Sequence, residues 1–414
     1  MWMFLKRRPL TAYLMYRALA LTWAYAPFQV YYLQRHGLSV ADVFDLNVVF
    51  CIAAVLFEVP TGAFADRRGR RVAMSLGAFV MTLSCACFVL GGSLWVYALA
   101  NVLSALSMCL SSGADSAFLY DHLEARKEST SYARWEGLGT AAKGVGNLGA
   151  VLVGALIYQY IHPAGVFWFT AATTAMAGVL ALGLPERRVV REGRVRDHLA
   201  RALRTLRSNT RLITLVVFGA VSFVLLRLSL FADQPHLEAH LHGAWLRHTV
   251  LTMGLLAGAK EIGTALLAGS AGFILGHVRA RTLAVSLAVS LVAAYALMGL
   301  DHGALCTPLM VLLATAFGLF SPLMRLLLNR VIDGSHERAT LLSVEGMGRR
   351  LLFAAMSPLF GRAVEASSLH ATFSGTAWVA GLAYLGLAVL GALAFGLWPR
   401  SAPRTSPASA LAAS

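Results

Sequence analysis

Charged side chains are scarce in this sequence. Asp, Glu, Lys and Arg make up 13% of its 414 residues, whereas hydrophobic residues make up 58%. A soluble protein carries roughly 25% charged residues, and a disordered chain needs low hydrophobicity. The composition therefore excludes both of these classes and predicts a polytopic membrane protein.

Cysteine is also rare, and its placement excludes a disulfide scaffold. The five cysteines are an odd number, and each falls inside an apolar stretch: Cys51, Cys85, Cys87, Cys109 and Cys306. None has the spacing of a metal site, so we interpret them as small packing residues. The sequence also lacks a nucleotide-binding loop and the Ser-x-x-Lys and His-Glu-x-x-His patterns of hydrolases. We therefore expect no catalytic residue, no metal and no cofactor.

What the chain does contain is a series of long apolar runs. A membrane helix needs about 20 mostly apolar residues. Twelve runs fit, near 10–34, 42–65, 71–91, 94–121, 134–160, 163–184, 211–235, 248–276, 281–300, 304–332, 339–365 and 372–398. The first is an uncleaved span, because no small-residue cleavage site follows it. The predicted fold class is all-α, a polytopic membrane protein with twelve transmembrane helices.

The net charge of +15 reflects orientation in the membrane. Most Lys and Arg residues fall in the loops on the side of the two termini, and few fall in the opposite loops. Because basic residues accumulate in cytoplasmic loops, we expect a multi-pass protein of a bacterial cytoplasmic (inner) membrane with both termini cytoplasmic. The charge excess then needs no nucleic-acid partner, since the lipid bilayer is the partner.

The longest cytoplasmic connection divides the chain in two. We expect six-helix bundles at 1–185 and 211–399, a linker at 186–210 and a disordered tail at 400–414. Basic residues recur near helical spacing in the linker, which predicts a short amphipathic helix on the inner membrane surface. They are Arg194, Arg201, Arg204 and Arg207.

Three landmarks recur between the two halves at an almost constant offset. Residues 62–66 match 272–276, residues 136–139 match 345–348, and the Gly91-Gly92 turn matches Asp301-His302. Three matches in register with equivalent topology indicate a duplication, hence two pseudo-symmetric bundles with a central cavity between them.

The loop between the second and third runs carries a recognisable motif, Gly62-x-x-x-Asp66-Arg67-x-Gly69-Arg70-Arg71. With Glu58-Val-Pro-Thr-Gly62 before it, the motif resembles the signature loop of the major facilitator superfamily, and in particular bacterial members described as drug exporters. The resemblance implies that Asp66 faces the start of the eleventh span. It also implies that Arg70 pairs with Asp121. The alternative is a loop that only sets topology.

Charges inside spans are costly and usually functional. In the first half Arg17, Glu58, Asp115 and Lys143 lie at one depth, which predicts either a functional site or a structural ion-pair cluster. The repeat offset maps Asp115 onto Arg325, so these two opposite charges are expected to meet as a latch between the halves near the cytoplasmic mouth.

In the second half Arg227, Lys260 and Glu261 lie nearer the middle or outer third of the membrane. A desolvated carboxylate beside a basic group is the arrangement that a proton carrier needs. The alternative is a satisfied Glu261–Arg227 pair.

Several other features have two interpretations. Gly144-x-Gly146-x-x-Gly149 spells a dinucleotide fingerprint without the strand it requires, so we expect a helix face for close packing. The histidines between Asp233 and His248 favour a polar outer loop over a metal site. Gln29, Gln234 and Pro235 are cavity candidates, and the proline is expected to break its helix.

The leading interpretation is a secondary transporter and not an enzyme. It would move a small amphipathic molecule by alternating access, as a monomer, through proton-coupled efflux. The efflux assignment comes from the resemblance to drug exporters, yet the span-five proline common in proton-exchanging exporters is absent here, where Ala150 follows Gly149. An importer or uniporter of the same fold is the first alternative, and a non-transporting membrane receptor is the second.

Overall fold

The computed structural model describes residues 8–20, 22–185, 206, 209–240, 249–300, 306–332 and 335–395. These residues form helices joined by short turns, with no strand among them. The linker helix expected within 186–210 falls almost wholly outside the described residues. The outer loop from 241 to 248 and the tail 400–414 lie outside them too.

The helices follow the twelve expected runs in order. The first half contains α2 (Pro9–Ala20), η1 (Ala26–Phe28), α3 (Gln29–Arg35), α4 (Val40–Arg68), α5 (Arg70–Leu90), α6 (Leu94–Ser111), α7 (Ala114–Glu124), η2 (Ser129–Ser131), α8 (Tyr132–Tyr160) and α9 (Gly165–Leu182). The second contains α11 (Thr210–His240), α12 (Thr249–His277), α13 (Ala280–Leu300), α14 (Cys306–Asn329), α15 (Ser335–Ala366) and α16 (Leu369–Phe395).

Ten membrane-spanning candidates satisfy length and apolar composition among the described residues. The first and eleventh expected runs are not among them. The first is divided between α2, η1 and α3, and α15 carries several charges along its length, including Glu345, Arg349 and Arg350. Charges in a spanning helix normally face a bundle interior or a cavity, so the charged face of α15 is expected to lie against other helices and not against lipid.

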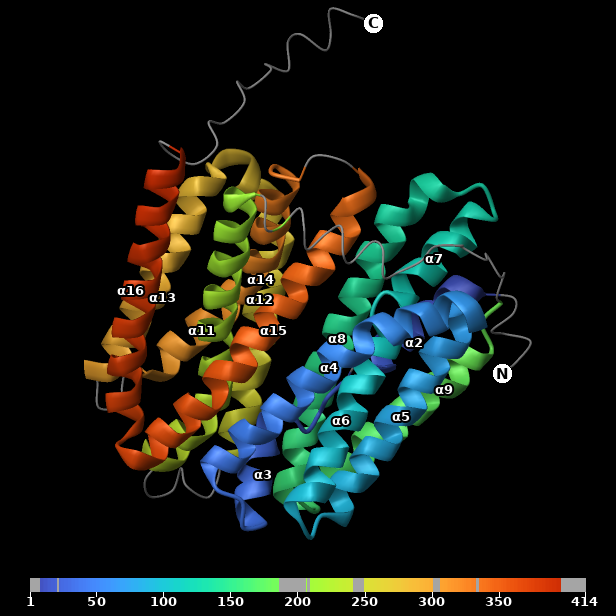
Figure 1. Cartoon of the computed structure of the whole chain (residues 1–414). Coiled ribbons are helices and arrows are strands. Elements are labelled where there is room, and N and C mark those ends of the chain that lie inside the picture. The colour runs from blue at the N-terminus through green and yellow to red at the C-terminus, as the bar shows by residue number, and fades with distance from the viewer. Residues whose placement is uncertain are drawn as a thin grey trace, which may run out of the picture.

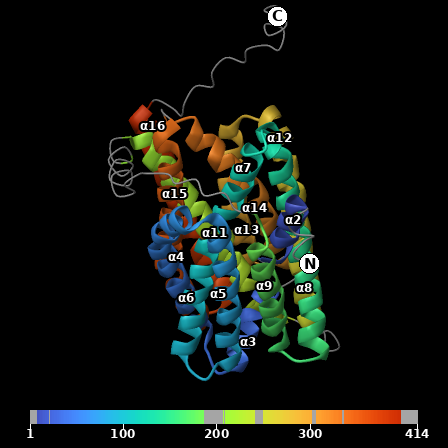
Figure 2. The same ribbon diagram turned by 90° about the vertical axis from the view of Figure 1, so that its right-hand side faces the viewer.

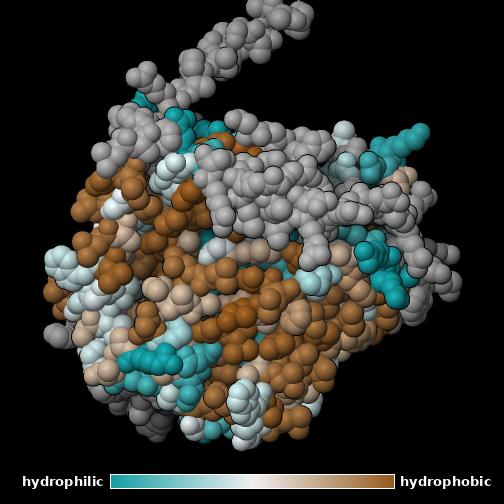
Figure 3. Space-filling model, viewed as in Figure 1, coloured by the Kyte–Doolittle hydropathy of each residue, from teal (hydrophilic) through white to brown (hydrophobic). Residues whose placement is uncertain are grey.

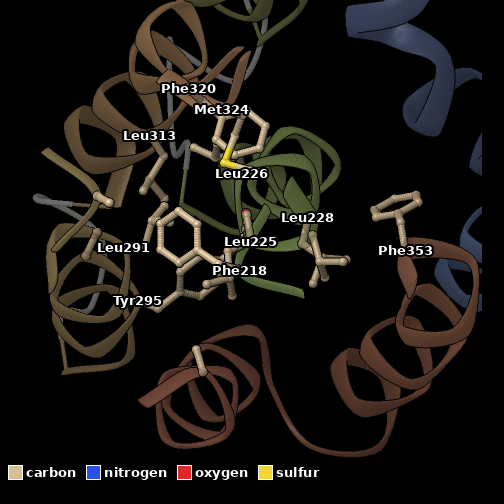
Figure 4. Close-up of a cluster of buried hydrophobic side chains, with 14 of the residues drawn as sticks. Phe218, Leu225, Leu226, Leu228, Leu291, Tyr295, Leu313, Phe320, Met324 and Phe353 are labelled. Atoms are coloured by element: carbon tan, nitrogen blue, oxygen red, sulfur yellow. Dashed lines mark hydrogen bonds between the residues drawn. The ribbon is translucent and has the colours of Figure 1, made fainter. Parts of the chain in front are cut away.

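The helices form two bundles that stand side by side (Figure 1), and their long axes run in similar directions when the molecule is turned (Figure 2). In the first bundle α5 packs against α6 and α9, and α2 packs against α8 and α9. In the second, α11 lies among α14, α15 and α16. Phe218 of α11 meets Leu291 and Tyr295 of α13 in the buried core of this bundle (Figure 4).

Local sequence explains where helices begin and end. Gly69 separates α4 from α5 at φ +108°, a conformation that L side chains rarely adopt, so the signature loop needs glycine there. At the opposite end of α4, Ser39 and Asp42 form a capping box that satisfies two free backbone amides. Gly69 thus produces the sharp α4–α5 turn that carries the motif, and the capping box fixes where α4 begins.

The glycines of α8 allow one close helix contact. A Cβ on Gly146 would lie 1.9 Å from the carbonyl oxygen of Ala18 on α2, so only glycine fits. Gly144 and Gly149 face open space, with nothing within 4 Å of the point that a Cβ would occupy. The expected packing face is therefore confirmed at Gly146 and wrong at its two neighbours, because they point away from α2.

The outside of the bundles is strongly apolar. A broad hydrophobic area crosses the middle of the face in Figure 3, with hydrophilic residues toward its lower left and upper right. Large apolar side chains such as Trp95, Trp378 and Phe273 are 82%, 76% and 71% exposed. Soluble monomers rarely expose such surface, so it fits a hydrocarbon surround. All five cysteines are free and buried, as predicted.

Candidate functional site

Two helix pairs form most of the contact between the bundles: α4 with α15, and α8 with α12. We call the end of the molecule that holds α3 and the Gly91-Gly92 turn the α3 end, and the opposite end, which holds α7 and the Gly69 turn, the α7 end (Figure 1). Contacts between the halves gather toward the α3 end. The Phe44 and Phe360 rings lie 5.4 Å apart, and Arg362 contacts Asp45 at 2.9 Å.

Other contacts close the same end. The backbone amide of Tyr31 donates to the Gln234 side chain at 2.8 Å, which joins α3 to α11. On the second interface, a Cβ on Gly254 of α12 would lie 2.4 Å from the Cβ of Ala155 on α8, so the two helices approach closely. The halves are thus held together at the α3 end.

Each interface also contains a charge pair between the halves. Arg350 of α15 donates to Glu58 of α4. On the other interface Lys143 of α8 and Glu261 of α12 interact electrostatically at longer range, without a direct ion-pair contact, and Asn147 is placed to donate to the Glu261 carboxylate. Both pairs lie nearer the α7 end than the contacts named above. Their polarity is opposite, since the first half supplies the acid in one pair and the base in the other.

A buried ion cluster lies inside the first half. Arg17 of α2 pairs with Asp115 of α7, and these residues are only 9% and 8% exposed. Glu136 of α8 completes the cluster, lying 3.5 Å from Arg17 and accepting from the Ser116 hydroxyl at 2.9 Å. A buried charge of either sign is stable only when paired and hydrogen-bonded, so the cluster ties three helices of this bundle together.

Two expectations are corrected by this arrangement. Glu58 shares a depth with Arg17 and Asp115 but turns toward the other half, whereas Lys143 interacts electrostatically with Arg17 and Asp115 as well as with Glu261. Asp115 contacts Arg17 and not Arg325, which is exposed and lies near Arg349. The reason is direction: α7 starts after the kink at Gly113, φ +80°, which points Asp115 into its own bundle.

The pairing considered for the second half is also wrong. Glu261 faces Lys143 of α8, whereas the Arg227 guanidinium carbon lies over the Phe231 ring, 5.4 Å from its centroid. Depth along a helix gives the height of a charge in the membrane, but it does not say which neighbour the helix face meets.

A cavity of about 240 Å³ lies between the halves. Polar and charged side chains on its wall are Gln29, Asn47, Asn101, Ser104, Arg227, Gln234, Lys260 and Glu261, and aromatic ones are Trp23, Tyr25, Phe50 and Phe231. Small-molecule sites are mostly apolar with a few placed polar groups, and this cavity fits that description. The structure therefore brings together five residues singled out from the sequence, Gln29, Arg227, Gln234, Lys260 and Glu261.

Pro235 does not behave as expected. It lies inside α11, which continues to His240, so it neither ends the helix nor lines the cavity. His236, one residue on, is buried. The described residues contain no cluster of His, Cys, Asp or Glu that would hold a metal, and most of the histidine-rich loop lies outside them.

In the signature loop, the guanidinium of Arg70 contacts Asp66 at 2.5 Å, one turn away along the chain. Asp121 lines the same surface pocket as Arg70. Arg71 donates to the carbonyls of Leu182 and Leu184 at the end of α9, while Arg67 lies in the last turn of α4. Gly62 has nothing within 4 Å of a Cβ position, so no close approach occurs there in this structure.

Sequence reasoning missed the partners on α15. Arg350 pairs with Glu58, and Arg349 contacts Glu345 at 2.9 Å while lying over the Phe223 and Phe320 rings. The sequence did contain a signal for charged residues on this helix, because Glu345 occupies the repeat position equivalent to Glu136. Two adjacent arginines inside an expected span could have been singled out on the same grounds as Lys143.

Two pseudo-symmetric helical bundles around a central polar and aromatic cavity define the class of membrane transporters that work by alternating access. The family model of the Major Facilitator Superfamily matches residues 13–355, so the chain belongs to this superfamily. No curated protein matches the chain. It is a multi-pass membrane transporter of small molecules and not an enzyme.

Solved structures agree on the fold. The nucleoside transporter NupG shares 14% identity, with 92% of this chain and 98% of that chain covered and a TM-score of 0.78. A bacterial homologue of the human lysosomal transporter Spinster, in an inward-facing and occupied conformation, shares 16% identity, with coverage of 93% and 96% and a TM-score of 0.68. At these identities the likeness concerns the fold alone.

Proposed function

We propose that this chain exports a small amphipathic molecule in exchange for protons, with the central cavity as the substrate site and Glu261 as the proton-binding group. The observation that carries the proposal is the position of Glu261. It lines the cavity and faces Lys143 across the interface between the halves. Protonation of a carboxylate at that position changes both the binding of substrate in the cavity and the contact between the bundles.

The orientation follows from the distribution of charge. The basic signature loop at Gly69 lies at the α7 end, and basic loops are retained in the cytoplasm. If the α7 end is cytoplasmic, the contacts gathered at the α3 end close the outer side. The structure is then an inward-open state, in which the cavity loads from the cytoplasm.

Proton coupling would act through the Lys143–Glu261 pair. Ionised Glu261 attracts Lys143 and supports the α8–α12 interface, whereas a proton on Glu261 removes that attraction. The proton therefore changes the relative free energies of the two states that expose the cavity to opposite sides, which is the requirement for coupling.

Glu261→Gln is expected to uncouple transport from the proton gradient. The variant keeps the size and hydrogen-bonding capacity of the side chain but cannot bind and release a proton. In proteoliposomes, concentration-driven exchange of substrate should persist. Acidification of the compartment on the outer side of the protein, at the α3 end, should no longer drive substrate to accumulate there. Glu128→Gln, which alters an exposed carboxylate within the first half and outside the cavity, is the matched control. A Glu261→Gln protein that still concentrates substrate against its gradient would refute the assignment.

Import and uniport by the same fold remain the competing functions, and flux direction separates them. An efflux-deficient host carrying the gene should survive a panel of amphipathic compounds better than the same host without it. Increased sensitivity to the panel would instead indicate import, and flux unaffected by a proton gradient would indicate uniport.

A further inference from the structure

Arg227 holds a positive charge inside the cavity, and no acidic side chain among the described residues pairs with it. Its guanidinium stacks over the Phe231 ring at 5.4 Å, and it makes no ion pair or hydrogen bond with a described residue. A stacked guanidinium uses its flat face on the ring and keeps five N–H donors in the plane around its edge. Those donors match a carboxylate or another planar oxyanion.

The charges around Arg227 do not neutralise it. Arg350 lies near it but is paired with Glu58, and the cavity carboxylate Glu261 faces Lys143. Lys260 adds a second basic side chain to the cavity wall. An ion buried in a membrane protein without a counter-charge is costly and usually belongs to a substrate pathway.

The rest of the cavity fits an aromatic body. Trp23 and Phe50 contact each other edge to face at 6.1 Å, and Trp23 stacks with Tyr25 at 6.3 Å, so these three residues form a continuous aromatic part of the cavity wall. We infer that the transported molecule is a small aromatic acid whose anionic group is held by Arg227. This inference rests on the proposed function and narrows its substrate class.

Binding to the purified protein in nanodiscs tests the inference without any gradient. The probes are indole-3-acetate, 1-naphthoate and salicylate, each beside its neutral amide and the corresponding amine, with affinity measured by calorimetry. At least one acid should bind tenfold or more tightly than its amide and its amine. Arg227→Gln should remove that preference, and Arg227→Lys should retain part of it.

Two controls keep the result interpretable. Arg126→Gln changes an exposed arginine within the first half and outside the cavity and should leave the acid preference intact. Arg227→Gln should unfold at the same temperature as the parent or higher, because the substitution removes an uncompensated charge. Failure of every acid to bind, equal binding of acids and amides, tighter binding of amines, or an acid preference that survives Arg227→Gln would each overturn the inference. Acid-selective binding without proton-driven flux would refute the coupling and leave this inference standing.

Discussion

Reversing the charge of either Glu58 or Arg350 is expected to abolish transport, and reversing both is expected to restore at least a tenth of it. The pair joins α4 to α15 across the halves, and both side chains are about three-quarters buried, at 28% and 25% exposure. A single reversal places two like charges against each other in a region of low dielectric. It thereby depopulates the state closed at the α3 end, without which the transport cycle cannot turn over.

A cross-linking assay measures this directly. Cysteines replace Asp45 and Arg362 at the α3 end in a protein whose native cysteines are substituted, and a short bifunctional thiol reagent joins them. The rate should fall at least tenfold in Glu58→Arg and in Arg350→Glu, and recover in the double variant. Reversal of the exposed Arg126–Glu128 pair, 52% and 44% exposed and within one half, is the control and should change nothing. Singles that cross-link like the parent would show that the pair does not hold the interface.

Gly146→Ala is expected to prevent stable folding, whereas Gly144→Ala is expected to be neutral or stabilising. The added methyl at Gly146 would lie 1.9 Å from the Ala18 carbonyl oxygen, and because the obstacle is backbone, no rotamer change relieves it. Overpacking costs about 1–3 kcal/mol even where side chains can yield, so separation of α2 from α8 should cost roughly 3 kcal/mol or more. At Gly144 nothing lies within 4 Å, and alanine favours the helix by about 1 kcal/mol.

The five buried free cysteines provide the readout, because they react with a fluorogenic maleimide only as the protein unfolds. Gly146→Ala should give little folded protein or a clearly lowered unfolding temperature in detergent, and Gly144→Ala should match or exceed the parent. Equal unfolding temperatures for the two variants would mean that α2 and α8 do not meet as closely as described.

Most of the fold could be predicted from the sequence because the relevant signals depend only on position along the chain. Apolar runs mark spans, and the positions of Gly69 and of the repeat landmarks follow from chain geometry alone. The cavity was partly predictable for the same reason: Gln29, Gln234, Arg227 and Glu261 are polar residues at similar depth in apolar helices.

Pairing partners were not predictable, because they depend on helix rotation and tilt. Asp115 and Arg325 occupy equivalent repeat positions, yet the kink before α7 directs Asp115 to Arg17. Glu58 shares the depth of that cluster, but its helix forms the interface, so its partner is Arg350 of the other half. Lys143 interacts electrostatically both with the cluster and with Glu261 of the other half. The sequence predicted the depth of each charge in the membrane, but the rotation and tilt of its helix, which decide its partner, came from the structure.

Double electron–electron resonance between spin labels at positions 68 and 330 tests the central claim, that the halves alternate under the control of Glu261. Arg68 ends α4 and Arg330 follows α14, and both are exposed. In nanodiscs the parent should show two distances, a longer one for the proposed inward-open state and a shorter one for the state closed at the α7 end. Acidification should change their proportions. The Glu261→Gln protein should show proportions independent of pH. A single distance that ignores pH in the parent, or a pH response that persists unchanged in Glu261→Gln, would contradict the account.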